Sequence, residues 1–163
     1  MTHLENIQHK IISRKDLNEQ LATWKAENKK IVFTNGCFDI LHLGHIDYLS
    51  KAADMGDVLL IGLNADASVS RLKGPHRPVN NENSRGMILA ALAFVGVVVK
   101  FDEDTPYDLI KQVQPDVLVK GADYSIEQIV GHDIVQARGG EVRTIAYIDG
   151  YSTSAIEKKI KES

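Results

Sequence analysis

Residues 33–49 read FTNGCFDILHLGHIDYL, and this stretch shows the unit from which the fold is built. The apolar run at 29–34 that leads into it is typical of a short strand buried on both faces. A glycine turn follows, and a helix is predicted from about residue 45 to 55. His42 and His45 fall at the junction, where the chain leaves the strand and the helix begins. The order of strand, turn and helix indicates a unit of a parallel sheet.

The same order recurs along the chain, which contains no repeat or evident linker. Apolar strands that alternate with helices predict an α/β fold, a doubly wound, five-stranded, Rossmann-like parallel sheet in a single domain spanning 1–163. An N-terminal helical segment, 1–28, would pack on it. In such a sheet, ligands bind at the carboxyl ends of the strands. Further strands are predicted at 57–63, 95–101, 116–120 and 141–148, and further helices at 13–28, 85–95, 105–113, 125–138 and 152–162.

Composition excludes several classes of protein. Hydrophobic residues make up 44% of the 163 positions and the net charge is −3, which is typical of a globular domain and argues against nucleic acid as a partner. No apolar run approaches the ~20 residues that span a membrane. The N-terminus lacks the pattern of a secretion signal, and the single cysteine excludes an internal disulfide. We therefore expect a soluble, cytoplasmic protein without a membrane partner.

The turn at the end of the first predicted strand has the features of an anion site. Asn35-Gly36 permits a tight turn, and Gly44 lets a ligand or a strand come close to the helix start. The first N–H groups of a helix lack partners and lie at its positive end. His42 and His45 beside them would donate to phosphate oxygens. Alternatively, both histidines cap the helix, satisfy buried carbonyls or bind a metal, although no neighbouring Cys or Glu completes a zinc set.

Two other segments after strands offer similar groups. Lys120 ends the fourth predicted strand, beside Gly121, where it would bind a phosphate or merely extend its amine to solvent. Three hydroxyl residues open the last helix, where they would cap it or help its N–H groups to hold phosphates: Ser152, Thr153 and Ser154.

Five motifs carry a family resemblance. HLGH after NGCFD resembles the HxGH signature of the nucleotidyltransferase superfamily related to class I aminoacyl-tRNA synthetases. Together with GLNADASVSRLKGPHRPVN, EDTPYDLI, PDVLVKGADY and GYSTSAIEKKI, it is similar to the D-glycero-β-D-manno-heptose 1-phosphate adenylyltransferases from about residue 11 to 161. In many bacteria these enzymes form the second half of a bifunctional kinase–adenylyltransferase. No kinase half is present here, so the resemblance implies a standalone enzyme.

The resemblance implies transfer of AMP from ATP to heptose 1-phosphate, giving ADP-heptose and pyrophosphate for lipopolysaccharide core or other surface glycans. The partners would be small molecules, the cofactors ATP and Mg²⁺, and the assembly a homo-oligomer. A sugar phosphate, with its second pKa near ~6, is already an anion at neutral pH and needs no general base. The reaction instead needs positioning and positive charge. No carboxylate cluster marks a metal site, so Mg²⁺ would arrive with ATP.

The resemblance also implies roles for individual residues. His42, His45 and Lys73 would be catalytic. Cys37 is rejected as a nucleophile because direct displacement forms no covalent intermediate. Residues expected around ATP are Asn35, Gly36, Cys37, Phe38, Gly44, Lys120, Gly121, Ser152, Thr153 and Ser154. Residues expected around the sugar phosphate are Asp39, Asn64, Asp66, Arg77 and Arg85, although their types also suit turns, caps and solvated surface.

Two other functions share parts of the pattern. HxGH and the final Ser/Thr turn also occur in cytidylyltransferases that act on glycerol 3-phosphate or a phosphoalkanolamine. RLKGPHRPVN and LVKGADY favour the sugar-phosphate branch instead. A nucleotide-sensing module without catalysis is the third possibility, and the presence of Lys73 with both histidines argues against it.

Overall fold

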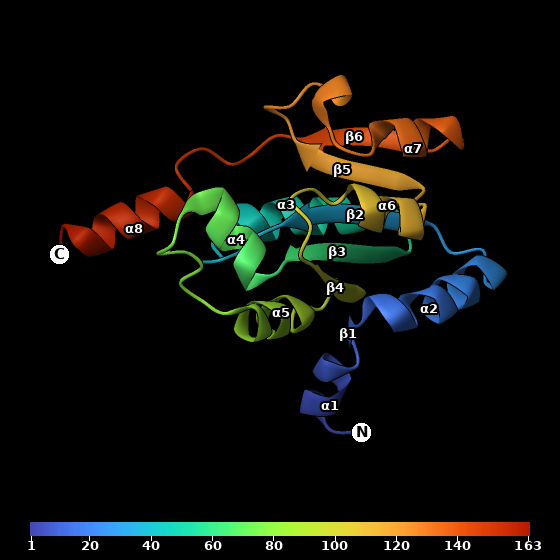
Figure 1. Cartoon of the computed structure of the whole chain (residues 1–163), viewed down its shortest axis with the longest axis horizontal. Coiled ribbons are helices and arrows are strands. Elements are labelled where there is room, and N and C mark those ends of the chain that lie inside the picture. The colour runs from blue at the N-terminus through green and yellow to red at the C-terminus, as the bar shows by residue number, and fades with distance from the viewer.

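The computed structural model describes all of residues 1–163 and contains one sheet of six parallel strands in the order β1-β4-β3-β2-β5-β6. The predicted α/β, Rossmann-like fold is confirmed, with one strand more than the five expected (Figure 1). The strands are β1 (Ile11–Ile12), β2 (Ile31–Gly36), β3 (Val58–Asn64), β4 (Val97–Phe101), β5 (Val117–Gly121) and β6 (Glu141–Ile145).

The strand that the sequence analysis missed is the edge strand β1. It is two residues long and pairs with β4 through Ile11↔Val98 and Ile12↔Val99. A run this short has no measurable periodicity, so sequence patterns do not reveal it. The segment 1–28, predicted as a helical segment packed on the domain, therefore also extends the sheet.

Helices cover both faces of the sheet (Figure 1). The buried side chains of α2, α6 and α7 join one core cluster, and those of α3 and α5 join the other. Along β2, Phe33 packs into the first cluster and Val32 into the second, as alternation in a strand requires. The helices are α1 (His3–Gln8), α2 (Arg14–Ala26), α3 (Leu43–Ala53), α4 (Asp66–Lys73), α5 (Glu82–Ala90), α6 (Tyr107–Val113), α7 (His132–Ala137) and α8 (Thr153–Lys161).

Several predicted helix boundaries are wrong for identifiable reasons. The helix predicted at 85–95 spans Glu82–Ala90, because the Asn81 side chain caps its start by accepting from Ser84 N at 2.9 Å. The helix predicted at 105–113 begins at Tyr107, since Pro106 itself occupies the cap position.

The helix predicted at 125–138 is divided in two. A short 3-10 turn, η1 (Ile126–Gln128), precedes α7. Gly131 separates them in a left-handed conformation, with φ of 89°. None of the helices is both long and apolar enough for a membrane span.

Gly131 provides a test of this arrangement. Gly131→Ala adds a methyl group to a residue with φ of 89° and places it 2.7 Å from the buried Ile110 Cδ1. We expect a loss of about 2–3 kcal/mol in the free energy of unfolding, measured by urea denaturation. Gly139→Ala is the matched control, since Gly139 has φ of 81° but no atom near its added methyl group. Equal losses in the two variants would contradict the packing argument.

Candidate active site

The turn after β2 holds Phe38 against His45. Phe38 adopts a left-handed conformation, with φ of 47°, which is rare for a bulky residue and typical of functional turns. Its ring lies over Gly36, where a Cβ atom would be 2.9 Å from Phe38 Cε2. The ring also contacts His45 edge-on, with centroids 5.5 Å apart. Gly36 is therefore needed for the close approach of this ring.

Helix α3 begins two residues before the predicted start, with His42 as its N-cap. The Gly44 N–H donates to His42 Nδ1 at 3.1 Å, and the His42 N–H donates to His45 Nδ1 at 3.4 Å. The capping alternative of the sequence analysis thus describes this structure. In a neutral ring whose Nδ1 accepts, the proton lies on Nε2. Capping therefore leaves each histidine with an Nε2–H that is able to donate to a phosphate oxygen.

Both imidazoles are held neutral. The His42 and His45 ring centroids are 3.9 Å apart. Burial is the main cause that lowers the pKa of His45 to about 4, with His42 and Lys73 contributing. Burial also lowers the pKa of His42. At neutral pH the pair therefore supplies hydrogen-bond donors rather than fixed positive charge.

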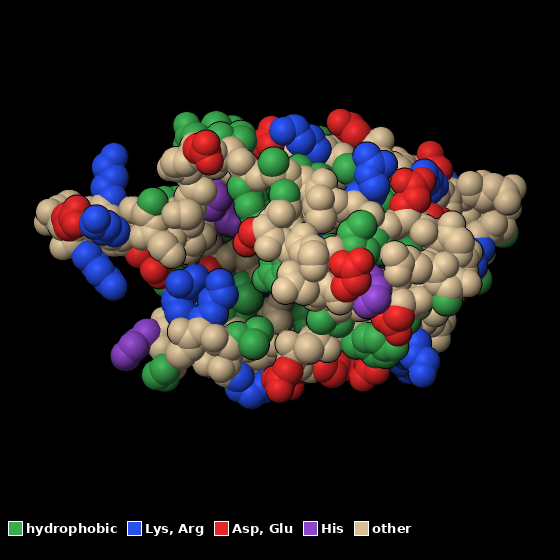
Figure 2. Space-filling model, turned by 90° about the horizontal axis from the view of Figure 1, so that it is seen from above, with side chains coloured by type: hydrophobic (Ala, Val, Ile, Leu, Met, Phe, Trp, Pro, Cys, Tyr) green, Lys and Arg blue, Asp and Glu red, His purple; other side chains and the backbone are tan.

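A cavity of about 200 Å³ lies at the carboxyl ends of β2 and β5. In the space-filling view, basic side chains and a histidine lie around a hollow on the side of the molecule toward α8 (Figure 2). Predicted site residues supply ten of its lining positions: Asn35, Gly36, Cys37, Phe38, Asp39, His45, Lys73, Arg77, Lys120 and Thr153. Segments far apart in the sequence thus meet where the sequence analysis expected a ligand.

The two lysines that line this cavity differ in burial. Lys73, at the end of α4, is exposed and makes no ion pair. Lys120 is partly buried, and its Nζ donates to Asn35 O at 3.4 Å and lies 5.9 Å from the ring centroid of Tyr124. Burial lowers the pKa of Lys120. Both amines are available to a bound anion.

Three tyrosines line the cavity and were missed by the sequence analysis: Tyr48, Tyr124 and Tyr147. Tyr48 and Tyr147 stack with centroids 5.8 Å apart. Tyr147 also lies over Gly121, where a Cβ atom would overlap its ring. Gly121 is therefore needed to leave room for this tyrosine in the cavity lining. No motif marks these positions, because isolated tyrosines on a helix and in loops have no distinctive spacing.

Asp39 does not present a free carboxylate. Its oxygens accept from Val79 N and Arg77 Nε, both at 2.7 Å, and from Asn80 N at 2.8 Å. Burial alone would raise the pKa of Asp39, but these hydrogen bonds outweigh it and lower the pKa. Arg77 also pairs with Glu157 of α8 at 2.9 Å. Asp39 and Arg77 therefore join the turn after β2 to the loop after α4 and to α8.

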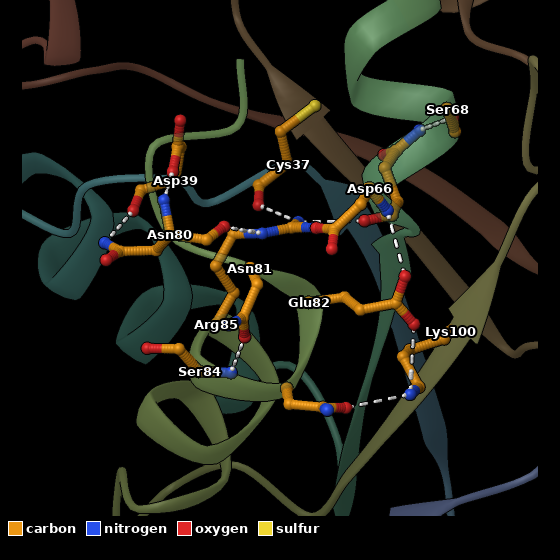
Figure 3. A network of polar contacts seen from close by, with 12 residues as sticks. Cys37, Asp39, Asp66, Ser68, Asn80, Asn81, Glu82, Ser84, Arg85 and Lys100 are labelled. Atoms are coloured by element: carbon orange, nitrogen blue, oxygen red, sulfur yellow. Dashed lines mark hydrogen bonds and ion pairs between the residues drawn. The ribbon is translucent and has the colours of Figure 1, made fainter. Parts of the chain in front are cut away.

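Arg85 lies outside the cavity at the centre of a polar network (Figure 3). Its side chain is fully buried and pairs with Asp66 Oδ1 at 2.8 Å. It also donates to the carbonyls of Cys37, Asn64 and Asn80 at 2.7–2.9 Å. The sequence analysis expected Arg85 at the sugar phosphate, but four of its five N–H groups donate within the chain and its side chain does not line the cavity.

Asn64 and Asp66 likewise lie away from the cavity lining. Asn64 is buried and donates to Ser68 Oγ at 2.9 Å. Asp66 receives the Arg85 ion pair. The sequence analysis placed both in the sugar or nucleotide pocket, and this structure uses them to hold the end of β3 instead.

The last helix approaches the cavity with its N-terminus. Ser152 caps α8 by accepting from Ala155 N at 3.0 Å, and the Thr153 hydroxyl donates to Ile40 O at 3.3 Å. Of the three predicted hydroxyl residues, only Thr153 lines the cavity, and Ser154 is exposed. Gly44 lies beneath the His42 ring, where a Cβ atom would be 2.9 Å from Cε1.

Comparison with known proteins places this geometry in a family. The family described as cytidylyltransferase-like matches residues 33–159. The chain belongs to the cytidylyltransferase-like family. It is accordingly a nucleotidyltransferase, as the sequence predicted.

Relatives of this cytidylyltransferase-like chain include proteins named Bifunctional protein HldE. That of Campylobacter curvus is 54% identical over 96% of this chain and 32% of its own length. That of Ectopseudomonas mendocina is 60% identical over 84% of this chain and 29% of its own length. The chain thus spans about a third of the length of the curated relatives that it matches.

A solved structure resembles it as well. The lipopolysaccharide core biosynthesis protein from Thermoplasma volcanium is 29% identical, with a TM-score of 0.60 over 76% of this chain and 99% of that chain.

The burial of His45 predicts a pH dependence of stability. The folded pKa near 4 lies below the ordinary 6.5, so the unfolded chain binds a proton that the folded chain does not between these values. The stability that the neutral His45 ring contributes is therefore complete above about pH 6.5 and is lost as the pH falls toward 4. Urea denaturation of wild type and His45→Gln should show a difference that shrinks over this range. Parallel curves would refute it, and His76→Gln, at an exposed loop residue, is the control.

The buried Arg85 predicts a large effect on stability. Arg85→Met leaves three carbonyl groups without their charged donor, and we expect a loss of roughly 3–5 kcal/mol in the free energy of unfolding. Arg71→Met is the matched control, because Arg71 pairs with Asp102 and Asp104 on the surface and such pairs contribute about 1 kcal/mol or less. A similar, small loss in both variants would contradict the role of Arg85.

Proposed function

We propose that the chain transfers AMP from ATP to D-glycero-β-D-manno-heptose 1-phosphate, forming ADP-heptose and pyrophosphate. Relatives named Bifunctional protein HldE, 50–60% identical, support this proposal. Their length suggests that this chain corresponds to their adenylyltransferase part. The name of the Thermoplasma volcanium structure supports a place in lipopolysaccharide core synthesis.

The observation that carries the proposal is the convergence of phosphate-binding groups on one cavity. His45 and Lys73 line it together with Arg77, Lys120 and Thr153. His42 adds a second ring 3.9 Å from that of His45. Donors and cations placed where charge develops are what phosphoryl-type transfer requires, because the nucleophile is already an anion.

The reaction would proceed by direct displacement. An oxygen of the sugar phosphate attacks the α-phosphorus of ATP, the new P–O bond forms, and the bond to pyrophosphate breaks. The Nε2–H groups of His42 and His45 donate to the phosphate oxygens as negative charge gathers on the leaving pyrophosphate. Lys73 bridges the incoming phosphate and the α-phosphate. Thr153 and the N-terminus of α8 hold the other end of the triphosphate.

Mg²⁺ would enter as the ATP complex. The chain gathers no group of three His, Cys, Asp or Glu side chains able to hold a metal. Mg²⁺ commonly binds through substrate phosphates and water with few protein ligands. No residue of this chain is assigned to it, and its contribution would be neutralisation of the triphosphate charge.

The remaining expectations from the sequence belong to the same proposal. They are a cytoplasmic location, a homo-oligomeric assembly and small-molecule partners without nucleic acid or membrane, and the net charge of −3 supports the absence of nucleic acid.

A cytidylyltransferase acting on glycerol 3-phosphate or a phosphoalkanolamine is the second candidate. The family that matches the chain is described as cytidylyltransferase-like, which supports this candidate. A pyrophosphate-release screen that crosses four nucleoside triphosphates with several sugar 1-phosphates and glycerol 3-phosphate decides between them. We expect release with ATP and the heptose phosphate. Release only with CTP and glycerol 3-phosphate would refute the proposal, and release with no pair would favour a nucleotide sensor.

The histidines and Lys73 provide the mutational test. His42→Ala or His45→Ala should lower kcat by two or more decades, because each removes a donor to the transition state. Lys73→Ala should raise the KM for the sugar phosphate and lower kcat. Near-normal turnover in these variants, with folding checked by circular dichroism, would contradict their roles. His76→Ala is the control, because His76 is an exposed residue of the loop that follows Lys73.

A further inference from the structure

A second cavity, of about 150 Å³, adjoins the first. The two share Asn35, Lys120 and Tyr124, which therefore form the boundary between them. Asn35 Oδ1 is the one buried side-chain oxygen or nitrogen in the chain without a hydrogen-bond partner. Such an orphaned atom is costly and needs an explanation. A ligand that donates near Asn35 would provide one.

The lining of the second cavity differs in kind from that of the first. Away from the shared boundary it contains the Asp104 carboxylate, the Thr105 hydroxyl and the Gln128 amide. Lys120 is its only cation. A triphosphate would find one cation there, whereas a compound with many hydroxyl groups finds both donors and acceptors.

The polar groups of this lining have unused hydrogen-bonding capacity. Asp104 Oδ1 pairs with Arg71 Nε at 3.0 Å, and Gln128 Oε1 accepts from Ser125 N at 3.0 Å. Asp104 Oδ2 and Gln128 Nε2 take part in no hydrogen bond within the chain. An acceptor and a donor therefore remain for a ligand.

The direction of attack separates the two substrates. In-line displacement brings the nucleophile to the side of the α-phosphorus opposite the leaving group. His45 and Thr153, assigned to the leaving pyrophosphate, line only the first cavity. Lys73, assigned to the incoming phosphate and the α-phosphate, also lines only the first cavity. The phosphate of the acceptor would then lie there, and its sugar would extend past Asn35 and Lys120 toward the second cavity.

The first cavity also offers a surface for the nucleoside. Tyr147 lines it, is 53% exposed and stacks on Tyr48. An exposed aromatic face suits a flat base, and Tyr147 does not line the second cavity. With the nucleoside on this side, the second cavity remains for the other substrate.

We propose that the second cavity holds the sugar ring of the phosphorylated acceptor, with Asp104, Thr105 and Gln128 binding its hydroxyl groups. Its phosphate reaches past Asn35 and Lys120 to the α-phosphorus. This inference rests on the proposed function. It assigns the binding of the sugar to these three residues in place of Asp39, Asn64 and Asp66, whose polar groups bind other parts of the chain.

Thr105→Val and Gln128→Met test it by steady-state kinetics, with pyrophosphate release as the readout. Each should raise the KM for the sugar 1-phosphate at least about fivefold, and the double variant about 30-fold, since each loses a hydrogen bond to the sugar. The KM for ATP should change less than twofold. Thr23→Val, the same substitution on an exposed residue of α2, is the matched control. Thermal unfolding checks that the variants remain folded.

The outcomes separate the inference from the function on which it depends. Wild type that uses no sugar 1-phosphate overturns both. Wild type that uses one, with both variants unchanged in the KM for the sugar, overturns the inference alone. A rise in the KM for ATP in place of that for the sugar would assign the second cavity to the nucleoside, and would also overturn the inference.

Discussion

The site depends on the hydrogen bond from the Gly44 N–H to His42 Nδ1 and on its partner from the His42 N–H to His45 Nδ1. These bonds begin α3, and they also determine which nitrogen of each ring carries the proton. The cap therefore leaves on each ring the Nε2–H that the proposed donation to phosphate needs. The sequence analysis treated capping and phosphate binding as alternatives, but this geometry makes them compatible.

A second constraint keeps the loops around this cap in place. Arg85 joins the end of β3 to the turn after β2, and Asp39 joins the same turn to the loop that follows α4. These buried polar contacts have a large effect because a missing partner inside a protein is costly. Arg85 and Asp39, which the sequence analysis expected around the sugar phosphate, thus hold in place the turn and the loop around His45 and Lys73.

The sequence predicted the sheet well because β2 to β5 are largely apolar runs separated by clear helical patterns. It failed where tertiary contacts decide: β1 is too short to show a period, and the break at Gly131 depends on packing against Ile110. For the site, glycine and histidine spacing indicated the turn before α3. The partner of a polar side chain is not visible in a sequence, so the contacts of Arg85 and Asp39 within the chain were not predicted, and Tyr147 was missed.

The attachment of α8 has a consequence for how the reaction cycle can end. This helix buries none of its residues, and its described side-chain links to the rest of the molecule are the Arg77–Glu157 ion pair and the Thr153 hydrogen bond to Ile40. Detaching it would expose little apolar surface, so its departure costs far less than opening the sheet. The part of the cavity wall that Thr153 supplies is therefore its least firmly attached part, and we expect it to open before the sheet does when a bound molecule leaves.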